Sequence, residues 1–362
     1  MAGCKGLSLM SGGLDSQLAV RVLQNAGAEV EAVCFSTPFF DISAAKKAAD
    51  ALGVKLHIVD FTDDEISLIE NPPHGFGGAM NPCIDCHALM IRRAGELMTR
   101  LGYDFVATGE VQGQRPMSQN KQSMGVVEKC SGLKGRLVRP MSAKLLEPTV
   151  PELEGKLDRE KLLDISGRGR ERQIALAAEF GIVDYPSPAG GCKLTEGGFC
   201  RKLKDLQDHE GLSNRKLVEL LLVGRRFRLP DGSSVILGRD RDENAVLKSR
   251  DSSLFLTGEA ESQNGEAESQ NGEAESFPLQ RKKLRGPLIL APCNVPGPTA
   301  LIPTLASDDD LALAEELVCS YSKYDRLEGN IVLLETGAAA KDARREVARP
   351  YVREKFKPYQ IC

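Results

Sequence analysis

The N-terminal half of the chain alternates between short apolar runs and longer amphipathic stretches. The short runs predict buried strands, and the stretches with helical spacing predict helices. The predicted strands are residues 4–10, 29–36, 54–61 and 103–110, and the predicted helices are residues 15–25, residues 41–52 and a helix that ends before Gly102. Strands that alternate with helices form a parallel sheet covered on both faces. We therefore expect an α/β, Rossmann-like domain in this half.

The C-terminal half has a different pattern. A helical stretch at 210–223 leads to Pro230-Asp231-Gly232, which is a hairpin turn signal, and residues 312–322 and 330–336 follow as a helix and a strand. We place a domain boundary near residue 210. The prediction is a larger domain at 1–209 and a smaller α+β domain at 210–362.

A repeat of period seven, GEAESQN, interrupts the second domain at residues 258–276. A heptad period is typical of coiled coils, but Ala is the apolar residue of each unit, so no apolar seam can be buried. We expect a disordered, Glu-rich loop. Removing its six Glu turns the net charge of −4 slightly positive, so an anionic partner is not excluded.

Composition narrows the class of protein. Hydrophobic residues make up 41% and charged residues 27% of the chain, which is typical of a soluble globular protein. The chain has no run of about 20 apolar residues and begins without a secretory pattern, so we expect a cytoplasmic protein without membrane contact. Ten cysteines in such a protein favour metal binding or redox chemistry over disulfides.

The hexapeptide SGGLDS lies between the first predicted strand and the first predicted helix. Gly12 and Gly13 let the backbone approach a phosphate, and the loop amides with the helix N-terminus form an anion site. Ser11 and Ser16 add hydroxyl donors, and Asp15 adds a carboxylate that can hold Mg²⁺ between phosphates. The chain contains no Walker A lysine motif.

The cysteines form a second pattern. Cys83 and Cys86, in NPCIDC, directly precede a predicted helix, and Cys192 and Cys200 lie in a Gly-rich loop much later. Cys-x-x-Cys has the spacing for two bonds to a metal or cluster, for a disulfide, or for an activated thiol. Three readings stay open: a three-cysteine iron–sulfur cluster, a persulfide/disulfide pair, or structural zinc that includes His87.

SGGLDS resembles the PP-loop of the ATP-pyrophosphatase superfamily, whose fold is that of the adenine nucleotide alpha hydrolases. The resemblance implies ATP cleavage between the α and β phosphates, an adenylated intermediate and pyrophosphate release. It places the adenine around Phe35, at the end of the second strand, and includes the segment TGE with Thr108 and Gly109.

NPCIDC after a PP-loop resembles the tRNA thiouridine synthetases, both the 2-thiouridylases and the 4-thiouridine synthetases. Their cluster-dependent members hold a [4Fe–4S] cluster with a CxxC pair and a third, distant cysteine. Cys83 and Cys86 match the pair, Cys192 matches the third ligand, and Cys200 is its rival. The segment VATGEVQGQRPMSQ is closest to the 4-thiouridine branch.

The second predicted domain is rich in cations. Arg225, Arg226 and Arg228 stand on the predicted hairpin, and the segment around them resembles the RNA-binding domain of NFACT-type proteins. Cation clusters beside a nucleotide-activating domain favour contact with a phosphate backbone. Both resemblances point to tRNA as the partner.

Together these patterns predict an ATP-dependent tRNA sulfurtransferase that uses ATP, Mg²⁺ and a [4Fe–4S] cluster, with Asp15, Cys83, Cys86 and Cys192 as catalytic residues. The sulfur donor is inorganic sulfide or a persulfide carrier. Two alternatives are a PP-loop sulfurtransferase that acts on a small molecule and a non-catalytic RNA-binding protein that contains zinc. The sequence does not tell which uridine is modified or how many chains assemble.

Overall fold

The computed structural model describes residues 3–115, 118–187, 191–248, 288–292, 296–303, 306–322, 330–336, 343–347 and 353–361, with backbone alone for 330–336 and 343–347. The predicted repeat loop at 258–276 lies outside these residues. The chain divides into two compact units, Met1–Cys200 and Arg201–Cys362. The division falls within helix α8 (Gly197–His209), whereas the predicted boundary falls at the end of that helix.

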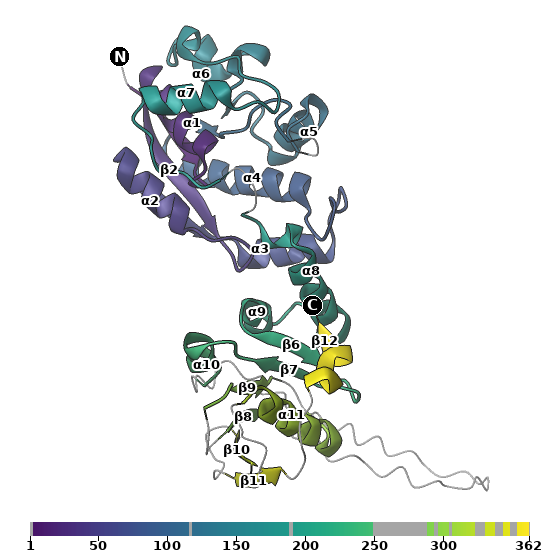
Figure 1. Ribbon diagram of the computed structural model, residues 1–362. Coiled ribbons are helices and arrows are strands. Elements are labelled where there is room, and N and C mark those ends of the chain that lie inside the picture. Colours follow the sequence, from purple (N-terminus) through teal and green to yellow (C-terminus); the bar gives the residue numbers. More distant parts are fainter. Residues whose placement is uncertain are drawn as a thin grey trace, which may run out of the picture. The chain divides into compact units, whose positions relative to one another are not determined.

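Unit 1 contains a five-stranded sheet in the order β3-β2-β1-β4-β5, and every neighbouring pair of strands is parallel. Its strands are β1 (Cys4–Leu9), β2 (Ala28–Ser36), β3 (Leu56–Asp60), β4 (Phe105–Ala107) and β5 (Leu137–Val138). Its helices are α1 (Leu14–Asn25), α2 (Ser43–Leu52), α3 (Thr62–Glu70), α4 (Cys83–Leu101), α5 (Lys121–Ser131), α6 (Val150–Leu153) and α7 (Glu171–Glu179), with short 3₁₀ turns at Ala143–Leu145, Arg159–Lys161 and Lys193–Thr195. The predicted parallel α/β sheet is confirmed (Figure 1).

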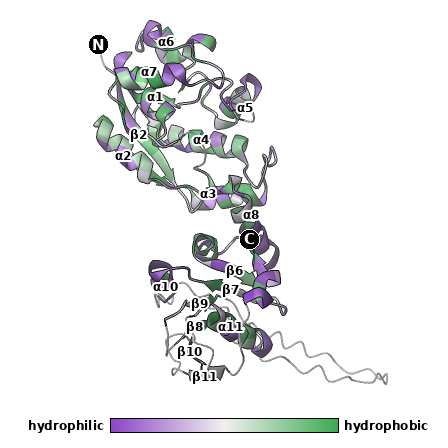
Figure 2. Ribbon diagram, in the orientation of Figure 1, coloured by the Kyte–Doolittle hydropathy of each residue, from purple (hydrophilic) through white to green (hydrophobic). Residues whose placement is uncertain are grey.

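Helices cover both faces of the sheet of unit 1. Successive side chains of a strand point to opposite faces, so the side chains of both faces are buried. In β2, Ala32 and Cys34 pack in one apolar cluster with residues of α1 and α2, while Val33 and Phe35 pack in another with residues of α4. Figure 2 shows the resulting apolar run along β2. Such a run is typical of parallel strands covered by helices on both sides.

The central strand β1 pairs with two partners of very different position in the chain. Its residues Cys4–Leu9 pair with β2, and Gly6–Ser8 pair with β4. A Cβ atom on Gly6 would lie 2.1 Å from the ring of Phe105, so glycine is required for β4 to pack here.

Unit 2 is built on an antiparallel sheet in the order β11-β10-β8-β9-β7-β6-β12. Its strands are β6 (Arg225–Arg228), β7 (Ser234–Leu237), β8 (Leu288–Pro292), β9 (Ala300–Ile302), β10 (Asn330–Thr336), β11 (Ala343–Val347) and β12 (Gln360–Ile361). Its helices are α9 (Arg215–Glu219), α10 (Arg241–Lys248) and α11 (Asp308–Tyr321), with 3₁₀ turns at Leu220–Leu222 and Arg353–Tyr359. The predicted hairpin is confirmed: β6 pairs with β7, and the amide of Gly232 donates to the carbonyl of Leu229 at 2.9 Å.

Candidate functional site

The predicted phosphate loop joins β1 to α1 and has the conformation that its glycines allow. Gly12 has a φ of +81°, and a Cβ atom there would lie 2.3 Å from the carbonyl carbon of Ala44 in α2. A side chain is therefore excluded both by the backbone conformation and by the neighbouring helix. The loop therefore has room for glycine at position 12 but not for a residue with a Cβ atom.

The helix that follows begins at Leu14, with Gly13 as N-cap and no side-chain cap. The first amides of a helix have no partner within it, so they form an anion site at this end. Two hydroxyls order the loop: Ser16 Oγ donates to the carbonyl of Gly13 at 2.8 Å, and Ser11 Oγ accepts from the amide of Gly13 at 3.3 Å. The predicted residues Ser11 to Ser16 thus form one compact turn.

The segment TGE lies directly against this loop. A Cβ atom on Gly109 would be 2.7 Å from the carbonyl of Asp15 and from the amide nitrogen of Ser16. SGGLDS and TGE therefore meet through close backbone contact. Thr108 is buried, and its hydroxyl donates to Glu110 Oε2 at 3.0 Å, so it is directed toward that carboxylate.

Asp15 carries an unsatisfied oxygen at the start of α1. Its Oδ2 accepts from Gln114 Nε2 at 3.0 Å, whereas its Oδ1 is buried and has no hydrogen-bond partner among the described residues. A buried oxygen without a partner needs a physical explanation. A divalent cation beside the phosphate loop supplies one, because hard cations prefer carboxylate oxygens.

Glu110 anchors the end of β4 to α4. It is buried, accepts from Arg139 Nε at 2.9 Å, and lies 3.3 Å from His87 Nδ1. Burial alone raises the pKa of Glu110, but the hydrogen bond with His87 and the charge of Arg139 lower it to about 2. The sequence analysis assigned no chemical role to Glu110 or Arg139. Glu110 links the end of β4 to α4 through contacts that form only in the folded protein, so the sequence alone could not reveal them.

Cys83 and Cys86 lie in the first turn of α4. The α4 helix precedes β4 and packs on it, so its N-terminus lies at the carboxyl edge of the sheet, as the His87–Glu110 contact shows. Cys83 is half-buried and its sulfur accepts from Asn81 Nδ2 at 3.0 Å. Cys86 is buried, and burial raises the pKa of its thiol well above the usual value.

Cys192 lies on a loop that packs beyond the carboxyl end of β2, whereas Cys200 lies in the first turn of α8 and not in the Gly-rich loop that the sequence predicted for it. The amide of Lys193 donates to the carbonyl of Phe39 at 2.7 Å, and Phe39 packs edge-on against Phe199. Burial raises the pKa of Cys192 to about 12. Cys200 is buried and its thiol donates to the carbonyl of Leu194 at 3.1 Å.

The predicted cysteines lie within electrostatic range of one another. Cys83 and Cys192 both contribute to the raised pKa of Cys86, and Cys83 and Cys200 contribute to the raised pKa of Cys192. Within the described ranges, no three His, Cys, Asp or Glu side chains are already arranged around one metal ion. A preformed one-ion site of the zinc type is therefore not present there.

Glu65 is a member of this group that sequence reasoning missed. It lies in α3, is 1% exposed, and its Oε1 accepts from the Cys86 thiol at 3.5 Å. Burial raises the pKa of Glu65 to about 7 against the lowering effect of hydrogen bonds with Cys86 and Thr37. The sequence gave little indication that Glu65 is buried, since three consecutive acids in the first turn of a helix normally face solvent.

Phe35 is not an open surface for a base. Its side chain is 4% exposed and packs edge-on against Phe61, with ring centroids 5.2 Å apart. Only the backbone of this residue, at the end of β2, can face an adenine; the predicted nucleotide contact at this position stays a prediction.

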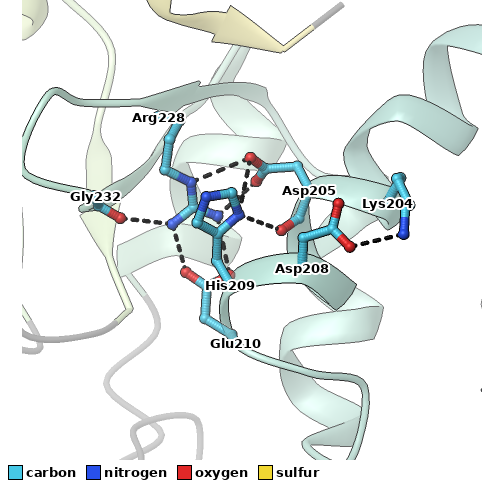
Figure 3. A network of polar contacts seen from close by, with 7 residues as sticks. All are labelled: Lys204, Asp205, Asp208, His209, Glu210, Arg228 and Gly232. Carbon is cyan, nitrogen blue, oxygen red and sulfur yellow. Dashed lines mark hydrogen bonds and ion pairs between the residues drawn. The ribbon is translucent and has the colours of Figure 1, made fainter.

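The three arginines of the predicted hairpin in unit 2 differ in whether they can contact a partner at the surface. Arg228 lies between Asp205 and Glu210, with 2.6 Å from Nη1 to Glu210 Oε1, and also donates to the carbonyl of Gly232 (Figure 3). Burial lowers the pKa of Arg228, but hydrogen bonds to both acids outweigh this and raise it. Its charge is neutralised within unit 2.

Arg226 is 1% exposed, so it cannot meet a partner at the surface, and burial lowers its pKa to about 10. Arg225 remains half-exposed, with its guanidinium carbon 5.3 Å from the ring centroid of Tyr321. The exposed Arg353 stacks on the same ring at 4.6 Å. Of the three hairpin arginines, Arg225 is therefore the accessible one, and the exposed Arg353 lies on the same ring.

In the part of the chain that the structure describes, no helix has both the length and the apolar character needed to cross a membrane.

Comparison with known proteins finds matches to the N-terminal region. Residues 2–143 match the model of the family described as thiamine biosynthesis protein (ThiI). The tRNA-specific 2-thiouridylase MnmA of Sulfurimonas denitrificans is 36% identical over 112 residues, which cover 28% of this chain and 32% of the relative. A probable tRNA sulfurtransferase of Thermoanaerobacter sp. is 34% identical over 119 residues, 30% of each chain. The chain thus spans about a third of the length of these curated relatives.

Among solved structures, a 4-thiouridine synthetase in complex with RNA and bound ATP covers 60% of this chain and 52% of its own, with 20% identity and a TM-score of 0.36. A predicted subunit of a tRNA methyltransferase from Methanocaldococcus jannaschii covers 49% and 75%, with 15% identity and a TM-score of 0.32. The family match ends at residue 143, so the RNA-binding resemblance of the C-terminal region stays a prediction.

Proposed function

We propose, from the match of residues 2–143 to the ThiI family model, that the chain is an ATP-dependent tRNA sulfurtransferase that replaces a uridine oxygen by sulfur. The observation that carries the proposal is a continuous path at one sheet edge. Gly109 lies against the phosphate loop, the next residue, Glu110, contacts His87, and His87 adjoins Cys86. Activation by ATP and delivery of sulfur thereby have neighbouring sites.

The phosphate half of the site is formed by residues Ser11–Ser16. The amides at the start of α1 bind the ATP phosphates, and Asp15, whose Oδ1 is buried without a partner among the described residues, would hold the Mg²⁺ that neutralises phosphate charge. The adenine lies at the end of β2, beside the backbone of Phe35. A uridine carbonyl oxygen attacks the α-phosphorus, the bond to the β-phosphate oxygen breaks, and pyrophosphate leaves. Loop amides stabilise the negative charge that develops on the phosphoryl oxygens.

The sulfur half of the site is formed by Cys83, Cys86 and Cys192. Three thiolates are the donors that a [4Fe–4S] cluster takes, so Cys83, Cys86 and Cys192 would hold it. The cluster supplies a sulfur nucleophile when it is bound. Cys192 is preferred to Cys200 because Cys192 acts electrostatically on Cys86, whereas the Cys200 thiol is bonded to the carbonyl of Leu194.

The second step exchanges the activated oxygen for sulfur. The sulfur of inorganic sulfide forms a bond to the uridine carbon, and the carbon–oxygen bond breaks with that oxygen leaving in AMP. When a persulfide carrier supplies the sulfur, a second thiol also attacks the sulfur–sulfur bond, which breaks, and the two thiols end as a disulfide. The reacting base has to be extruded from any helical stack, so a flexible tRNA region suits the site. Arg225 and Arg353, stacked on the ring of Tyr321, supply accessible cations for the tRNA phosphates.

Two variants separate the two halves. We expect Asp15→Ala to lower AMP and pyrophosphate formation by about a hundredfold or more, because the loop loses its cation ligand. We expect Cys192→Ala to keep adenylation and to abolish sulfur incorporation. Cys130→Ala, on α5, is the control because Cys130 lies outside the cysteine group. The readouts are AMP release and mass spectrometry of tRNA nucleosides after anaerobic incubation with ATP and sulfide.

The same assay tests the alternatives. A colourless, iron-free protein with full thiolation activity would support a persulfide/disulfide pair and reject the cluster. Sulfur transfer to a small acceptor without tRNA would support a small-molecule enzyme. A protein that contains zinc and releases no pyrophosphate would be a non-catalytic RNA-binding protein. Equal loss of adenylation and sulfur transfer in Cys192→Ala would contradict the division between the two halves.

A further inference from the structure

Phe76 lies exposed on the loop between α3 and α4. It is 42% exposed, and it is the only exposed Phe, Tyr or Trp residue in the part of the chain that the structure describes. A phenyl ring left in water gives up the free energy that its burial would contribute. The ring therefore offers an apolar, flat surface to a partner.

The loop that carries Phe76 is fixed at the start of α4 on both sides of that residue. On the N-terminal side, the amide of His74 donates to Asp85 Oδ2 at 2.9 Å, and His74 Nδ1 lies 2.6 Å from Asp85 Oδ1. On the C-terminal side, the amide of Gly77 donates to the carbonyl of Asn81 at 2.9 Å. The exposed ring thus stands on a loop that hydrogen bonds hold in place, which lowers the entropy cost of binding.

This support leads directly to a cysteine of the proposed sulfur site. Asn81 is buried, its Nδ2 donates to Cys83 Sγ at 3.0 Å, and its Oδ1 accepts from the amide of Ala79 at 3.0 Å. Because the carbonyl of Asn81 also accepts from Gly77, two hydrogen-bonded steps connect the residue after Phe76 with the Cys83 sulfur. A partner that lies on the ring is therefore held beside the cysteines.

The face of a nucleobase is the surface that matches such a ring. Every base has a flat π-face, and proteins bind unpaired RNA by stacking bases on aromatic side chains. A base that reacts in an enzyme site has first left its own helical stack, and an aromatic side chain can replace part of the stacking that it lost. Paired bases inside a helix present no free face, so an exposed ring selects unpaired RNA.

We propose that Phe76 stacks on an unpaired base of the tRNA and holds that region of the RNA beside the cysteines. This inference rests on the proposed function. Stacking reads the face of a base and not its edge, so Phe76 distinguishes unpaired from paired RNA without selecting one kind of base.

The test measures the affinity of the full chain for a fluorescent oligouridylate of about eight nucleotides, a length within the range that single-strand binding sites cover. Fluorescence anisotropy is recorded for this strand and for the same strand annealed to its complement. The variants are Phe76→Ala, Phe76→Leu, which keeps an apolar side chain without a ring, and Phe76→Tyr, which keeps the ring. Ile174→Ala, at a residue that is 52% exposed on α7, is the matched control. Urea unfolding verifies that each variant is folded.

We expect Phe76→Ala and Phe76→Leu to bind oligouridylate about tenfold more weakly than the wild type, and Phe76→Tyr and Ile174→Ala to stay within about twofold. The affinity for the duplex should be the same in every variant. Wild-type affinity for oligouridylate in Phe76→Ala or in Phe76→Leu would overturn the stacking. A dimer that depends on Phe76, together with unchanged oligouridylate affinity, would assign the ring to a contact between two copies of the chain and also overturn it.

Turnover separates this inference from the proposed function. Phe76→Ala should raise the KM for tRNA about tenfold and keep the kcat of thiolation within about twofold, because the ring holds the tRNA equally before and during the reaction. A wild type that thiolates tRNA, with an unchanged KM in Phe76→Ala, would overturn the inference while the proposed function stands. A wild type that releases no AMP but binds oligouridylate through Phe76 would refute the proposed function and leave the stacking surface.

Discussion

The contact between Gly109 and the phosphate loop can be tested with a single methyl group. In Gly109→Ala the new Cβ would lie 2.7 Å from three backbone atoms of Asp15 and Ser16, whereas ordinary contacts begin at 3.4 Å. Backbone atoms of a helix start cannot rotate away as a flexible side chain does. The start of α1 or the end of β4 has to shift by several tenths of an ångström, at a cost of about 1–3 kcal/mol.

The same shift displaces the amides that bind phosphate. In the wild type, ATP at about 100 times its dissociation constant stabilises the fold by about 2.7 kcal/mol. Gly109→Ala should lower the stability without nucleotide and also reduce the increment that ATP adds. The assay is urea unfolding of the full chain with and without ATP, followed by fluorescence of a probe on unit 1, with calorimetry for ATP affinity. Separate probes are needed because a chain of two units need not unfold in one step.

Gly125→Ala is the matched control, because Gly125 lies exposed within α5 and a Cβ atom there meets nothing within 4 Å. Alanine in a helix interior is favoured over glycine, so this variant should gain up to about 1 kcal/mol. If Gly109→Ala lowers the free energy of unfolding and Gly125→Ala raises it, the local contact at Gly109 is the cause. Unchanged stability and unchanged ATP affinity in Gly109→Ala would refute the packing argument.

Three further results are expected. The folded-state pKa of Glu110 is lowered from 4.5 to about 2. Its contribution to the free energy of unfolding is therefore complete above pH 4.5 and is lost as the pH falls toward 2. Glu110→Gln should remove that part of the pH dependence from an acid unfolding curve. Arg228→Met should destabilise unit 2 by about 3–5 kcal/mol in urea unfolding, because two acids lose their partner, whereas Arg215→Met, which breaks an exposed pair, should stay within about 0.5 kcal/mol. Replacing Arg225 and Arg353 together by Ala should reduce the slope of log tRNA affinity against log salt by about 2 in a filter-binding titration; an unchanged slope would remove them from the interface.

The parallel sheet was predictable because the sequence pattern of each strand and helix lies within that element. Each strand is a short apolar run, each helix is bounded by turn residues, and parallel strands bring their carboxyl ends to one edge. The meeting of SGGLDS with Gly109 follows from that topology. The predicted place of the CxxC pair at the start of a helix also agrees with the structure, where Cys83 and Cys86 lie in the first turn of α4.

Pairings set by tertiary packing were not predictable from the sequence. The acids of α3 look alike in the sequence, and only the rotation of the helix against its neighbours turns Glu65 inward. The arginines of β6 form one basic run in the sequence, yet alternation in the strand places Arg226 and Arg228 on one face, where Arg226 is buried and Arg228 pairs with Asp205 of α8. A cation count overstates a binding surface when buried acids from a distant segment neutralise part of it.

The position of β1 has a consequence for synthesis of the protein on the ribosome. β1 can pair with β2 as soon as Ser36 has emerged, but its other edge stays open until Phe105 arrives and fits over Gly6. An unpaired edge in the middle of an apolar sheet is a site for wrong association between nascent chains. Substitutions at Gly6 that delay closure should therefore lower the yield of protein from cells more than they lower the stability of the molecules that complete folding.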